Sequence, residues 1–492
     1  MIIHVLNFIQ INYLSFSKNA RMKKTKIVAT ISDKNCSVEF IEDLYKNGLN
    51  VVRLNTAHQS TGDALKVINM VRTVSEKIAI MIDTKGPEIR TTDCGEGIEF
   101  KAGDEVLMRG EPELACSKEC INVNHKGFVK ELNVNSQILI DDGYIILSIV
   151  EKTGDSLRCR FETDAVMKSR KSVNVPNTSF TLPSVSTKDR EFIHFAEAQN
   201  IDFIAHSFVR DAKDALAVQE ILDALKSKIK IIAKIENQQG VDNIDEILDN
   251  TYGIMVARGD LSVEIPYEKT PGVQKQLIQK CIGRRKPVII ATQMLHSMID
   301  NPRPTRAEVS DVAGAVYSQA DALMLSGETA FGKYPIEAIA TMSKIAAEVE
   351  KSKESFLDIS TVILHCEVSA FLTKAAVEAS VSLNAKAIIA DTISGRTIRN
   401  LSGYRGCKMI FAVCYSNRAM RELALSYGAN TIYKEAQSTS HEFLKEALSH
   451  IMHKNHLLNE DLVVVIAGNF GKSHGASYIE AGTIEDLMNS AQ

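Results

Sequence analysis

The stretch IKIIAKIE, residues 229–236, combines an isoleucine-rich run with two opposite charges near its end. Branched apolar residues of this kind favour a buried β-strand. Side chains alternate between the two faces of a strand, so Lys234 and Glu236, two positions apart, are expected on one face. The stretch therefore predicts a buried strand that brings an ammonium and a carboxylate to the same place.

Seven similar runs surround it in the chain. They are TKIVATI (25–31), NVVRLN (50–55), IAIMID (78–83), IDFIAHSFV (201–209), GIMVARGD (253–260), PVIIATQM (287–294) and ADALMLSGE (320–328). Amphipathic stretches such as SVEFIEDLYKNG lie between most of them. Eight strands alternating with helices predict an α/β fold of the closed (β/α)₈ type, a TIM barrel.

Two long segments do not fit this rhythm and predict further domains. Between strands three and four, turn signals (DCGEG, DDGY, KTGD) separate short alternating runs, which indicates an inserted small β-domain that acts as a lid. After about Ser352 an open α/β pattern begins. The expected division is an N-terminal extension at 1–21, disordered or upstream of a true start at Met22; a barrel at 22–87 and 185–352; a β-barrel lid at 88–184; and a C-terminal regulatory domain at 353–492.

The composition excludes several classes of protein. Apolar residues make up 45% and charged residues 24%, the balance of a soluble globular chain, and the net charge of −4 predicts neither a nucleic-acid nor a membrane partner. Nine cysteines without a CxxC pair indicate reduced thiols and a cytoplasmic location. His450, His453 and His456 fall at helical spacing, which favours a solvated helix face over a metal site.

Polar residues gather where the predicted strands end. Those ends meet at one mouth of a barrel, where barrel active sites form. Glu236 and Asp260 come from adjacent strands, and two carboxylates with remaining positions for water and substrate suit Mg²⁺ or Mn²⁺. Lys234 adds a compact positive charge and Arg53 a planar fork for phosphate oxygens. These groups predict phosphoryl-transfer chemistry.

The motifs themselves identify a resemblance. The strings TKIVATI, VVRLN, DTKGPEIRT, KIEN, IMVARGDL, ATQML, NPRPTRAEVSDVA and MLSGET, in this order, resemble the pyruvate kinase family over the chain from about Lys24. The resemblance implies that phosphoenolpyruvate and ADP give pyruvate and ATP, the last step of glycolysis. It also implies dependence on Mg²⁺ and K⁺ and, by the family's habit, a homotetramer.

The resemblance also implies roles for single residues. Lys234 would stabilise the phosphoryl transition state, Arg53 would lie near the phosphate, and Thr292 would help to deliver a proton to the enolate. Gly259 and Thr292 would contact the substrate carboxylate, and Glu236 and Asp260 would bind Mg²⁺. Arg90 and Lys171 match nucleotide contacts of the family. His58 would lie near the same pocket, where it could have either a structural or a binding role.

Some positions depart from the family's pattern. Three residues match the family's K⁺ ligands, namely Asn55, Asp83 and Thr84, but Ala57 stands where the family has a serine. Glu88 is the residue found in the K⁺-dependent members. Ser172 follows Lys171 where a glycine is usual. The loop TISGRT resembles the family's phosphate pocket for a sugar-phosphate effector, with Ile393 where some members carry lysine. Its candidate residues are Thr392, Ser394, Gly395, Arg396 and Thr397.

Two alternatives remain open at this stage. One is a metal-dependent lyase or aldolase acting on pyruvate or phosphoenolpyruvate, which would not need the nucleotide residues Arg90 and Lys171. The other is a non-catalytic regulatory relative, against which the intact set of Lys234, Glu236, Asp260 and Thr292 argues.

Overall fold

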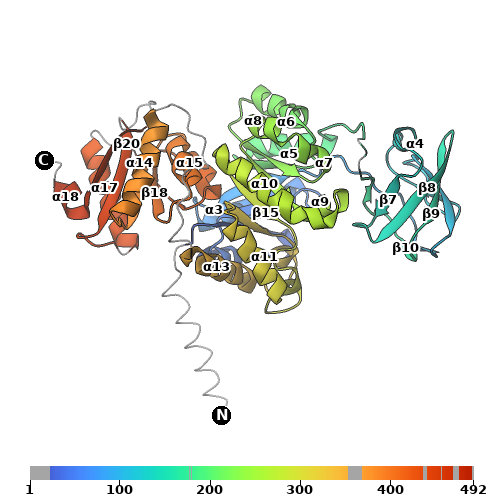
Figure 1. Cartoon of the computed structure of the whole chain (residues 1–492), viewed down its shortest axis with the longest axis horizontal. Coiled ribbons are helices and arrows are strands. Elements are labelled where there is room, and N and C mark those ends of the chain that lie inside the picture. The colour runs from blue at the N-terminus through green and yellow to red at the C-terminus, as the bar shows by residue number, and fades with distance from the viewer. Residues whose placement is uncertain are drawn as a thin grey trace, which may run out of the picture.

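The computed structural model describes residues 23–176, 178, 180–352, 368–435, 440–455, 457–468 and 476–489. Three bodies lie in a row, with a barrel in the middle, a β-rich insertion at one end and an α/β domain at the other (Figure 1). Within the described residues, no helix is long and apolar enough to cross a membrane.

The central body is a closed barrel of eight parallel strands, as predicted. Around the barrel the strands follow the order β1-β16-β15-β14-β13-β12-β3-β2. Their bounds are β1 Lys26–Thr30, β2 Val51–Asn55, β3 Ala79–Asp83, β12 Phe203–His206, β13 Lys230–Ile235, β14 Gly253–Ala257, β15 Val288–Ala291 and β16 Ala322–Leu325. Each strand falls inside one of the eight apolar runs, which confirms the fold class.

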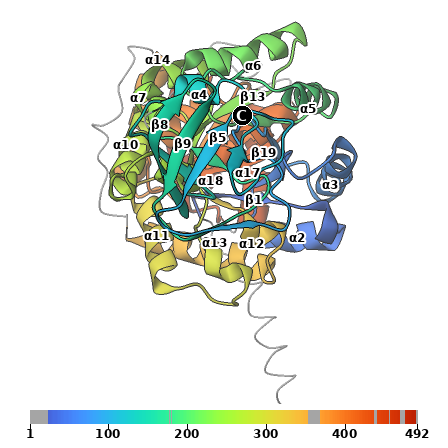
Figure 2. The same cartoon turned by 90° about the vertical axis from the view of Figure 1, so that its right-hand side faces the viewer.

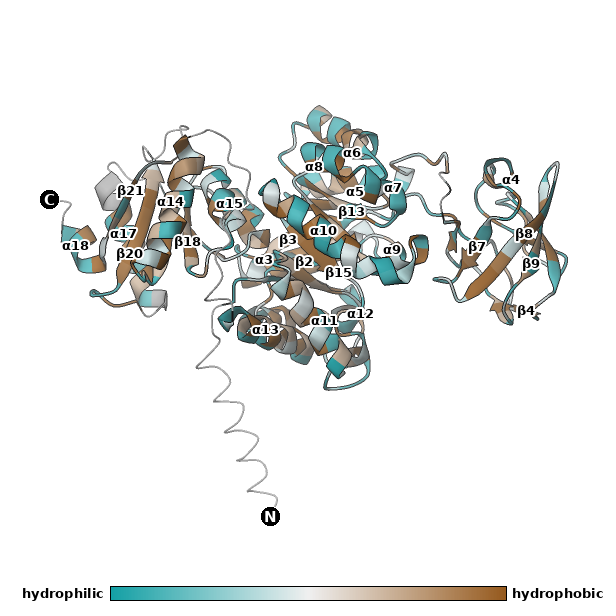
Figure 3. Cartoon of the chain, in the orientation of Figure 1, coloured by the Kyte–Doolittle hydropathy of each residue, from teal (hydrophilic) through white to brown (hydrophobic). Residues whose placement is uncertain are grey.

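Helices surround the barrel and turn their polar sides outward (Figure 3). Several begin at capping residues. For example, Ser186 and Asp189 form a capping box at α5, which provides hydrogen-bond partners for otherwise unpaired N–H groups of the first turn. The bounds are α2 Val38–Lys46, α3 Thr61–Val74, α5 Thr187–Ala198, α6 Ala212–Ala224, α7 Gln238–Asp242, α8 Ile244–Asn250, α9 Arg258–Glu264, α10 Thr270–Gly283, α11 Arg306–Tyr317, α12 Gly327–Ala330 and α13 Pro335–Lys351.

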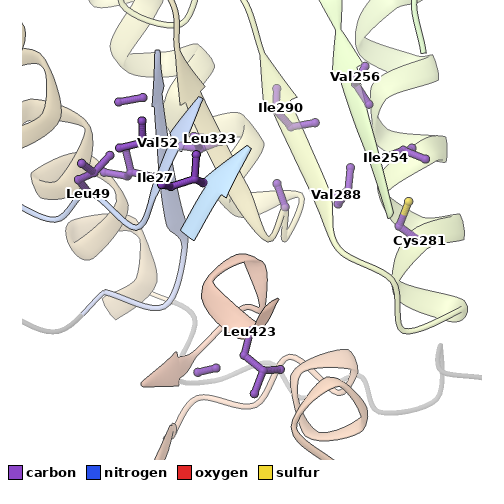
Figure 4. Close-up of a cluster of buried hydrophobic side chains, with 14 of the residues drawn as sticks. Ile27, Leu49, Val52, Ile254, Val256, Cys281, Val288, Ile290, Leu323 and Leu423 are labelled. Atoms are coloured by element: carbon purple, nitrogen blue, oxygen red, sulfur yellow. The ribbon is translucent and has the colours of Figure 1, made fainter. Parts of the chain in front are cut away.

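The alternation of side chains divides the core into two layers. In β13, Ile231, Ala233 and Ile235 belong to the layer between strands and helices, whereas Ile232 lies inside the barrel. Lys234 has the same parity as Ile232 and therefore also faces inward. Figure 4 shows part of the outer layer, with Leu423 of the C-terminal domain near the barrel strands.

The insertion after β3 has its own apolar core and its own sheets. A six-stranded sheet has the order β11-β7-β8-β9-β5-β6, and β10 pairs with β4. The bounds are β4 Ile98–Phe100, β5 Glu105–Arg109, β6 Cys120–Asn122, α4 Phe128–Glu131, β7 Gln137–Ile140, β8 Ile145–Thr153, β9 Ser156–Phe161, β10 Ala165–Met167 and β11 Val173–Asn174. Figure 2 views the molecule from the insertion's end.

The insertion approaches the carboxyl ends of the barrel strands. Asn174 Nδ2 on β11 donates to Glu264 Oε1 on α9, 3.0 Å away, and α9 directly follows β14. A cleft between insertion and barrel is lined by residues of both, including Glu88, Ser172, Asp260 and Glu264. The inserted β-domain therefore lies where a lid over the barrel mouth is expected.

The C-terminal domain carries a five-stranded sheet in the order β19-β18-β17-β20-β21. Its antiparallel edge strand β21 was not anticipated from the sequence. The bounds are α14 Val368–Ser382, β17 Ala387–Thr392, α15 Arg396–Gly403, β18 Met409–Cys414, α16 Asn417–Glu422, β19 Ala429–Tyr433, α17 Ser440–Asn455, β20 Leu462–Gly468, β21 Ala476–Thr483 and α18 Ile484–Asn489. His450 is half-buried and His453 exposed on α17, whereas His456 lies outside the described residues.

Buried ion pairs attach this domain to the barrel end opposite the insertion. Arg405 pairs with Asp321 at 2.6 Å, just before β16, and Arg421 pairs with Asp202 at 2.7 Å, just before β12. Ala424 and Leu425 join the apolar layer inside the barrel. The residue numbers given above for the domain boundaries stay a prediction, and the predicted extension 1–21 lies outside the described residues.

Candidate active site

Lys234 is the centre of a charged network inside the barrel mouth. Its Nζ lies 2.9 Å from Glu236 Oε1 and 3.2 Å from Asp83 Oδ1, and it donates to Ser207 Oγ at 2.7 Å. Only 9% of the residue is exposed. The adjacent carboxylates, Asp83 first, raise the pKa of Lys234 although burial opposes this, so the ammonium stays charged at neutral pH.

Arg53 extends the network from β2, the strand next to β3, which carries Asp83. Its Nε donates to Asp83 Oδ2 at 2.6 Å, and its Nη1 donates to Thr30 Oγ1 at 2.8 Å. Burial would raise the pKa of Asp83, but the charges of Arg53 and Lys234 outweigh it and hold the pKa below its usual range. Asp83 therefore forms ion pairs with both Arg53 and Lys234 and fixes these side chains before any substrate is present.

Two carboxylates, Glu236 and Asp260, lie beside the ammonium. Glu236 Oε2 accepts the N–H of Phe208 at 2.6 Å, a donor aimed by the left-handed backbone of Phe208 (φ +56°). Burial, and then the charge of Glu236, raises the pKa of Asp260 to about 7. Like charges held together in a buried site are the arrangement that a divalent cation relieves.

The donor set around Asp260 fits Mg²⁺ in kind and in number. Glu236 and Asp260 both offer hard oxygen ligands. The described residues contain no group of three or more His, Cys, Asp or Glu that would fill further coordination positions of the metal. Mg²⁺ usually keeps several waters and takes one or two protein carboxylates plus substrate oxygens. Glu236 and Asp260 are thus chemically suited to hold a magnesium ion.

The end of β15 supplies a strained turn. Thr292 and Gln293 both have left-handed backbone angles (φ +67° and +55°), which are costly for a β-branched residue such as threonine. The Thr292 hydroxyl accepts the N–H of Gly259 at 2.8 Å and donates to the Ala291 carbonyl at 2.6 Å. Strain of about 1–3 kcal/mol is often retained where it positions a functional group.

Arg258, the first residue of α9 directly after β14, has a structural partner instead. Its Nη1 pairs with Asp311 Oδ1 on α11 at 2.6 Å, and its Nη2 donates to the Thr292 carbonyl at 2.8 Å. The side chain therefore braces the Thr292 turn.

The predicted nucleotide residues lie on the lid side, apart from this network. Arg90 Nε pairs with Glu88 at 2.7 Å, and Lys171 Nζ pairs with Asp141 at 2.8 Å. The segments meet, because Arg90 and Ser172 form an antiparallel bridge. Glu88 lines the same cleft as Asp260, and the charges of Asp142 and Glu88 add to the effects of burial and Glu236 that raise the pKa of Asp260. His58 is exposed at the start of the loop after β2.

The oxygens predicted for a monovalent cation are close but already engaged. Asn55 Oδ1 accepts the N–H of Ala57 at 3.1 Å, and the Thr84 carbonyl accepts Ser207 Oγ at 2.7 Å. Ala57 has no hydroxyl to add. The set therefore fits K⁺ in chemical type, with one side-chain ligand fewer than the family's pattern.

Sequence reasoning overlooked His206, which lies directly behind Thr84. The side chain is fully buried, its Nδ1 is 3.2 Å from Thr84 Oγ1, and its Nε2 has no hydrogen-bond partner. Burial lowers the pKa of His206 to about 4, against the raising effect of Asp189 and Asp214. A polar residue inside the run IDFIAHSFV was the available signal. Ser207, the next residue of the same run, bridges Lys234 and Thr84 through its hydroxyl.

The predicted effector loop forms a compact turn in the C-terminal domain. Thr392 Oγ1 accepts the N–H of Gly395 at 2.9 Å, and Gly395 has a left-handed φ of +77°. This backbone conformation, which L side chains rarely adopt, favours glycine at the position. Ser394 and Arg396 are exposed, whereas Thr397 is buried at the start of α15.

Comparisons with known proteins agree with this geometry. The family described as "Pyruvate kinase, barrel domain" matches residues 22–339, and "Pyruvate kinase, alpha/beta domain" matches residues 371–480. The chain is 47% identical to a pyruvate kinase of Borreliella burgdorferi over 95% of its length and 98% of that protein. It is 41% identical to one of Staphylococcus epidermidis, over 91% and 78%. A solved pyruvate kinase of Cryptosporidium parvum superposes with a TM-score of 0.88 at 35% identity, over 94% of this chain and 96% of that one.

Proposed function

The chain belongs to the pyruvate kinase family, and we propose that it transfers the phosphoryl group of phosphoenolpyruvate to ADP, giving pyruvate and ATP. The observation that carries the proposal is the position of the Lys234 ammonium, 2.9 Å from Glu236 inside the barrel mouth. The ammonium is charged, almost fully buried, and held in position by Glu236, Asp83 and Ser207 before substrate binds.

In this proposal Lys234 and Arg53 stabilise the charge on the migrating phosphoryl group. Phosphoryl transfer passes through a loose transition state, so that catalysis depends on positioning and electrostatic stabilisation. Asp83 fixes both cations and removes the need to reorganise them during the reaction. A Mg²⁺ ion held by Glu236 and Asp260 would supply Lewis-acid neutralisation of the phosphate oxygens.

Thr292 serves the second half of the reaction, in which the enolate carbon takes up a proton. In the structure its hydroxyl is oriented by Gly259 and Ala291 at the mouth. We assign Thr292 to holding a water that delivers this proton, and the N–H groups at the start of α9, near Gly259, to the substrate carboxylate. The strained turn at Thr292 fixes that geometry.

The insertion provides the nucleotide side of the site. Arg90 and Lys171 carry positive charge on adjacent segments of the lid, each paired with a carboxylate that a polyphosphate can replace. Asn174 and Glu264 connect the lid to α9. We assign ADP to the cleft between lid and barrel, with His58 at its edge.

Further properties are proposed on the family alone. They are a monovalent cation, K⁺, at Asn55, Asp83 and Thr84; a sugar-phosphate effector at the loop of Thr392, Ser394, Gly395, Arg396 and Thr397; a homotetramer; and a cytoplasmic location.

One coupled assay tests the proposal. Pyruvate formation from phosphoenolpyruvate is followed with and without ADP, in buffer containing Mg²⁺ and K⁺. ADP-dependent pyruvate with an equal amount of ATP supports a kinase. Pyruvate formed without ADP would indicate a lyase-type or hydrolytic enzyme, and absence of turnover at all ADP concentrations would indicate a non-catalytic relative.

A further inference from the structure

A pair of thiols in the lid lies outside the site described above. Cys94 follows the segment of Arg90, and Cys116 belongs to the loop between β5 and β6. The Cys116 N–H donates to the Asp93 carbonyl at 2.7 Å, which joins the two backbones. Both sulfurs also contact Thr92: Cys94 Sγ lies 3.6 Å from its carbonyl oxygen and Cys116 Sγ 3.3 Å from its hydroxyl.

Cys116 is surrounded by hydrogen-bond donors. The Asn122 N–H points at its sulfur at 3.4 Å, and the Thr92 hydroxyl lies at 3.3 Å. The Asn122 carbonyl, which could accept from a protonated Cys116, is farther away at 3.6 Å. Two donors around one sulfur favour the thiolate, the reactive form of cysteine.

The protonation states of the two thiols divide accordingly. The nearby Cys94 thiol is the largest cause that lowers the pKa of Cys116, to about 6, whereas Cys116 and burial raise the pKa of Cys94. Cys116 is half-buried and reachable, and Cys94 is 5% exposed behind it. One thiol is thus a nucleophile and the other a protonated neighbour.

We propose that Cys94 and Cys116 form a peroxide-reactive pair, in which Cys116 is oxidised first and Cys94 resolves it to an intramolecular disulfide. The Cys116 thiolate attacks one oxygen of hydrogen peroxide, giving a sulfenic acid and hydroxide. The Cys94 sulfur then attacks the Cys116 sulfur, its proton leaves with the sulfenic hydroxyl as water, and the S–S bond forms. Two thiols lose two electrons and the peroxide gains them.

The second step is favoured by the first. The negative charge of Cys116 contributes to raising the pKa of Cys94, and oxidation to a neutral sulfenic acid removes that charge. Cys94 then ionises more readily next to its electrophile. The backbone contact at Asp93 keeps the two residues together throughout.

Cys120 is a matched control in the same region. It is half-buried like Cys116 and only four residues away, but burial raises its pKa, and its sulfur contacts the Asn122 side chain at 3.7 Å. Trypsin cleavage after Lys118 separates the two, giving GEPELACSK for Cys116 and ECINVNHK for Cys120. Cys94 falls in a third peptide, TTDCGEGIEFK.

The experiment exposes the reduced full-length protein to stoichiometric hydrogen peroxide and maps peptides without reduction. We expect TTDCGEGIEFK joined to GEPELACSK, in the parent and in Cys120→Ser. In Cys94→Ser, dimedone should trap a sulfenic acid on Cys116; in Cys116→Ser, Cys94 should stay reduced. A disulfide between Cys116 and Cys120 in the parent would overturn the proposal. So would over-oxidation of Cys116 in the parent without formation of any disulfide.

Alkylation of the native reduced protein gives a second readout that does not need peroxide. At pH 7 the larger thiolate fraction of Cys116 outweighs the lower nucleophilicity that accompanies a low pKa, and iodoacetamide should modify it at least about fivefold faster than Cys120. Equal rates for the two peptides would refute the activation of Cys116. Neither measurement depends on the proposed kinase activity.

Discussion

Replacement of Lys234 by methionine removes the charge at the centre of the site and keeps most of the side-chain volume. Nζ contacts Glu236 and Asp83 and donates to Ser207, so the ammonium has a fixed position relative to the proposed phosphate. Loss of one preorganised group of this kind raises a barrier by about 3–4 kcal/mol. We expect turnover of Lys234→Met to fall by about 10²–10³.

The loss of folding stability should be much smaller than the loss of activity. Breaking a buried ion pair costs about 3–5 kcal/mol when the remaining charge is left alone. Here Asp83 keeps Arg53 at 2.6 Å and Glu236 keeps the Phe208 N–H at 2.6 Å. The destabilisation should therefore stay at about 1–3 kcal/mol and leave a folded enzyme.

The assay is pyruvate formation at saturating phosphoenolpyruvate and ADP, with calorimetry of phosphoenolpyruvate binding in the presence of Mg²⁺. Binding should persist in Lys234→Met, because Arg53, the metal ligands and the Gly259 turn remain. Lys230→Met is the matched control, since Lys230 lies on the same strand at the opposite end of the barrel. Turnover of Lys234→Met within tenfold of the parent would refute the assigned role.

Three further predictions concern single groups of the site. Because burial and Glu236 raise the pKa of Asp260 to about 7, a proton competes with the metal below that pH; Mn²⁺ affinity, followed by electron paramagnetic resonance, should fall about tenfold per pH unit below 7 in the parent and stay flat in Asp260→Asn. Ala57→Ser should restore a hydroxyl ligand and lower the half-activating K⁺ concentration about two- to tenfold, with a parallel gain in Tl⁺ binding by NMR; an unchanged constant would show that position 57 does not face the cation. The folded pKa of His206 is lowered from 6.5 to about 4, so its contribution to stability is complete above pH 6.5 and is lost as the pH falls toward 4, about 3 kcal/mol in all. Urea unfolding at pH 6.5 and 4.5 should show about 2 kcal/mol of this loss in the parent and a smaller loss in His206→Gln, whereas equal losses would contradict it.

The sequence determined the fold class and the centre of the site, because both depend on short-range patterns. Apolar runs separated by amphipathic segments fix the order of strands and helices, and parallel strands can close only with their carboxyl ends at one mouth. The two-residue spacing of Lys234 and Glu236 fixes their common side. The motifs at the strand ends also indicated the family, because Lys234, Asp260 and Thr292 stand in strings that resemble those of its members.

Tertiary structure decided which of those polar residues interact and which are braces. No spacing in the chain shows that Asp83 binds both Arg53 and Lys234, that Arg258 turns to Asp311, or that His206 lies behind Thr84. These contacts join strands and helices that are far apart in sequence, and their energies depend on burial. The same holds for Cys94 and Cys116, ordinary residues in the sequence, whose proposed reactivity comes from the donors that folding places around one sulfur.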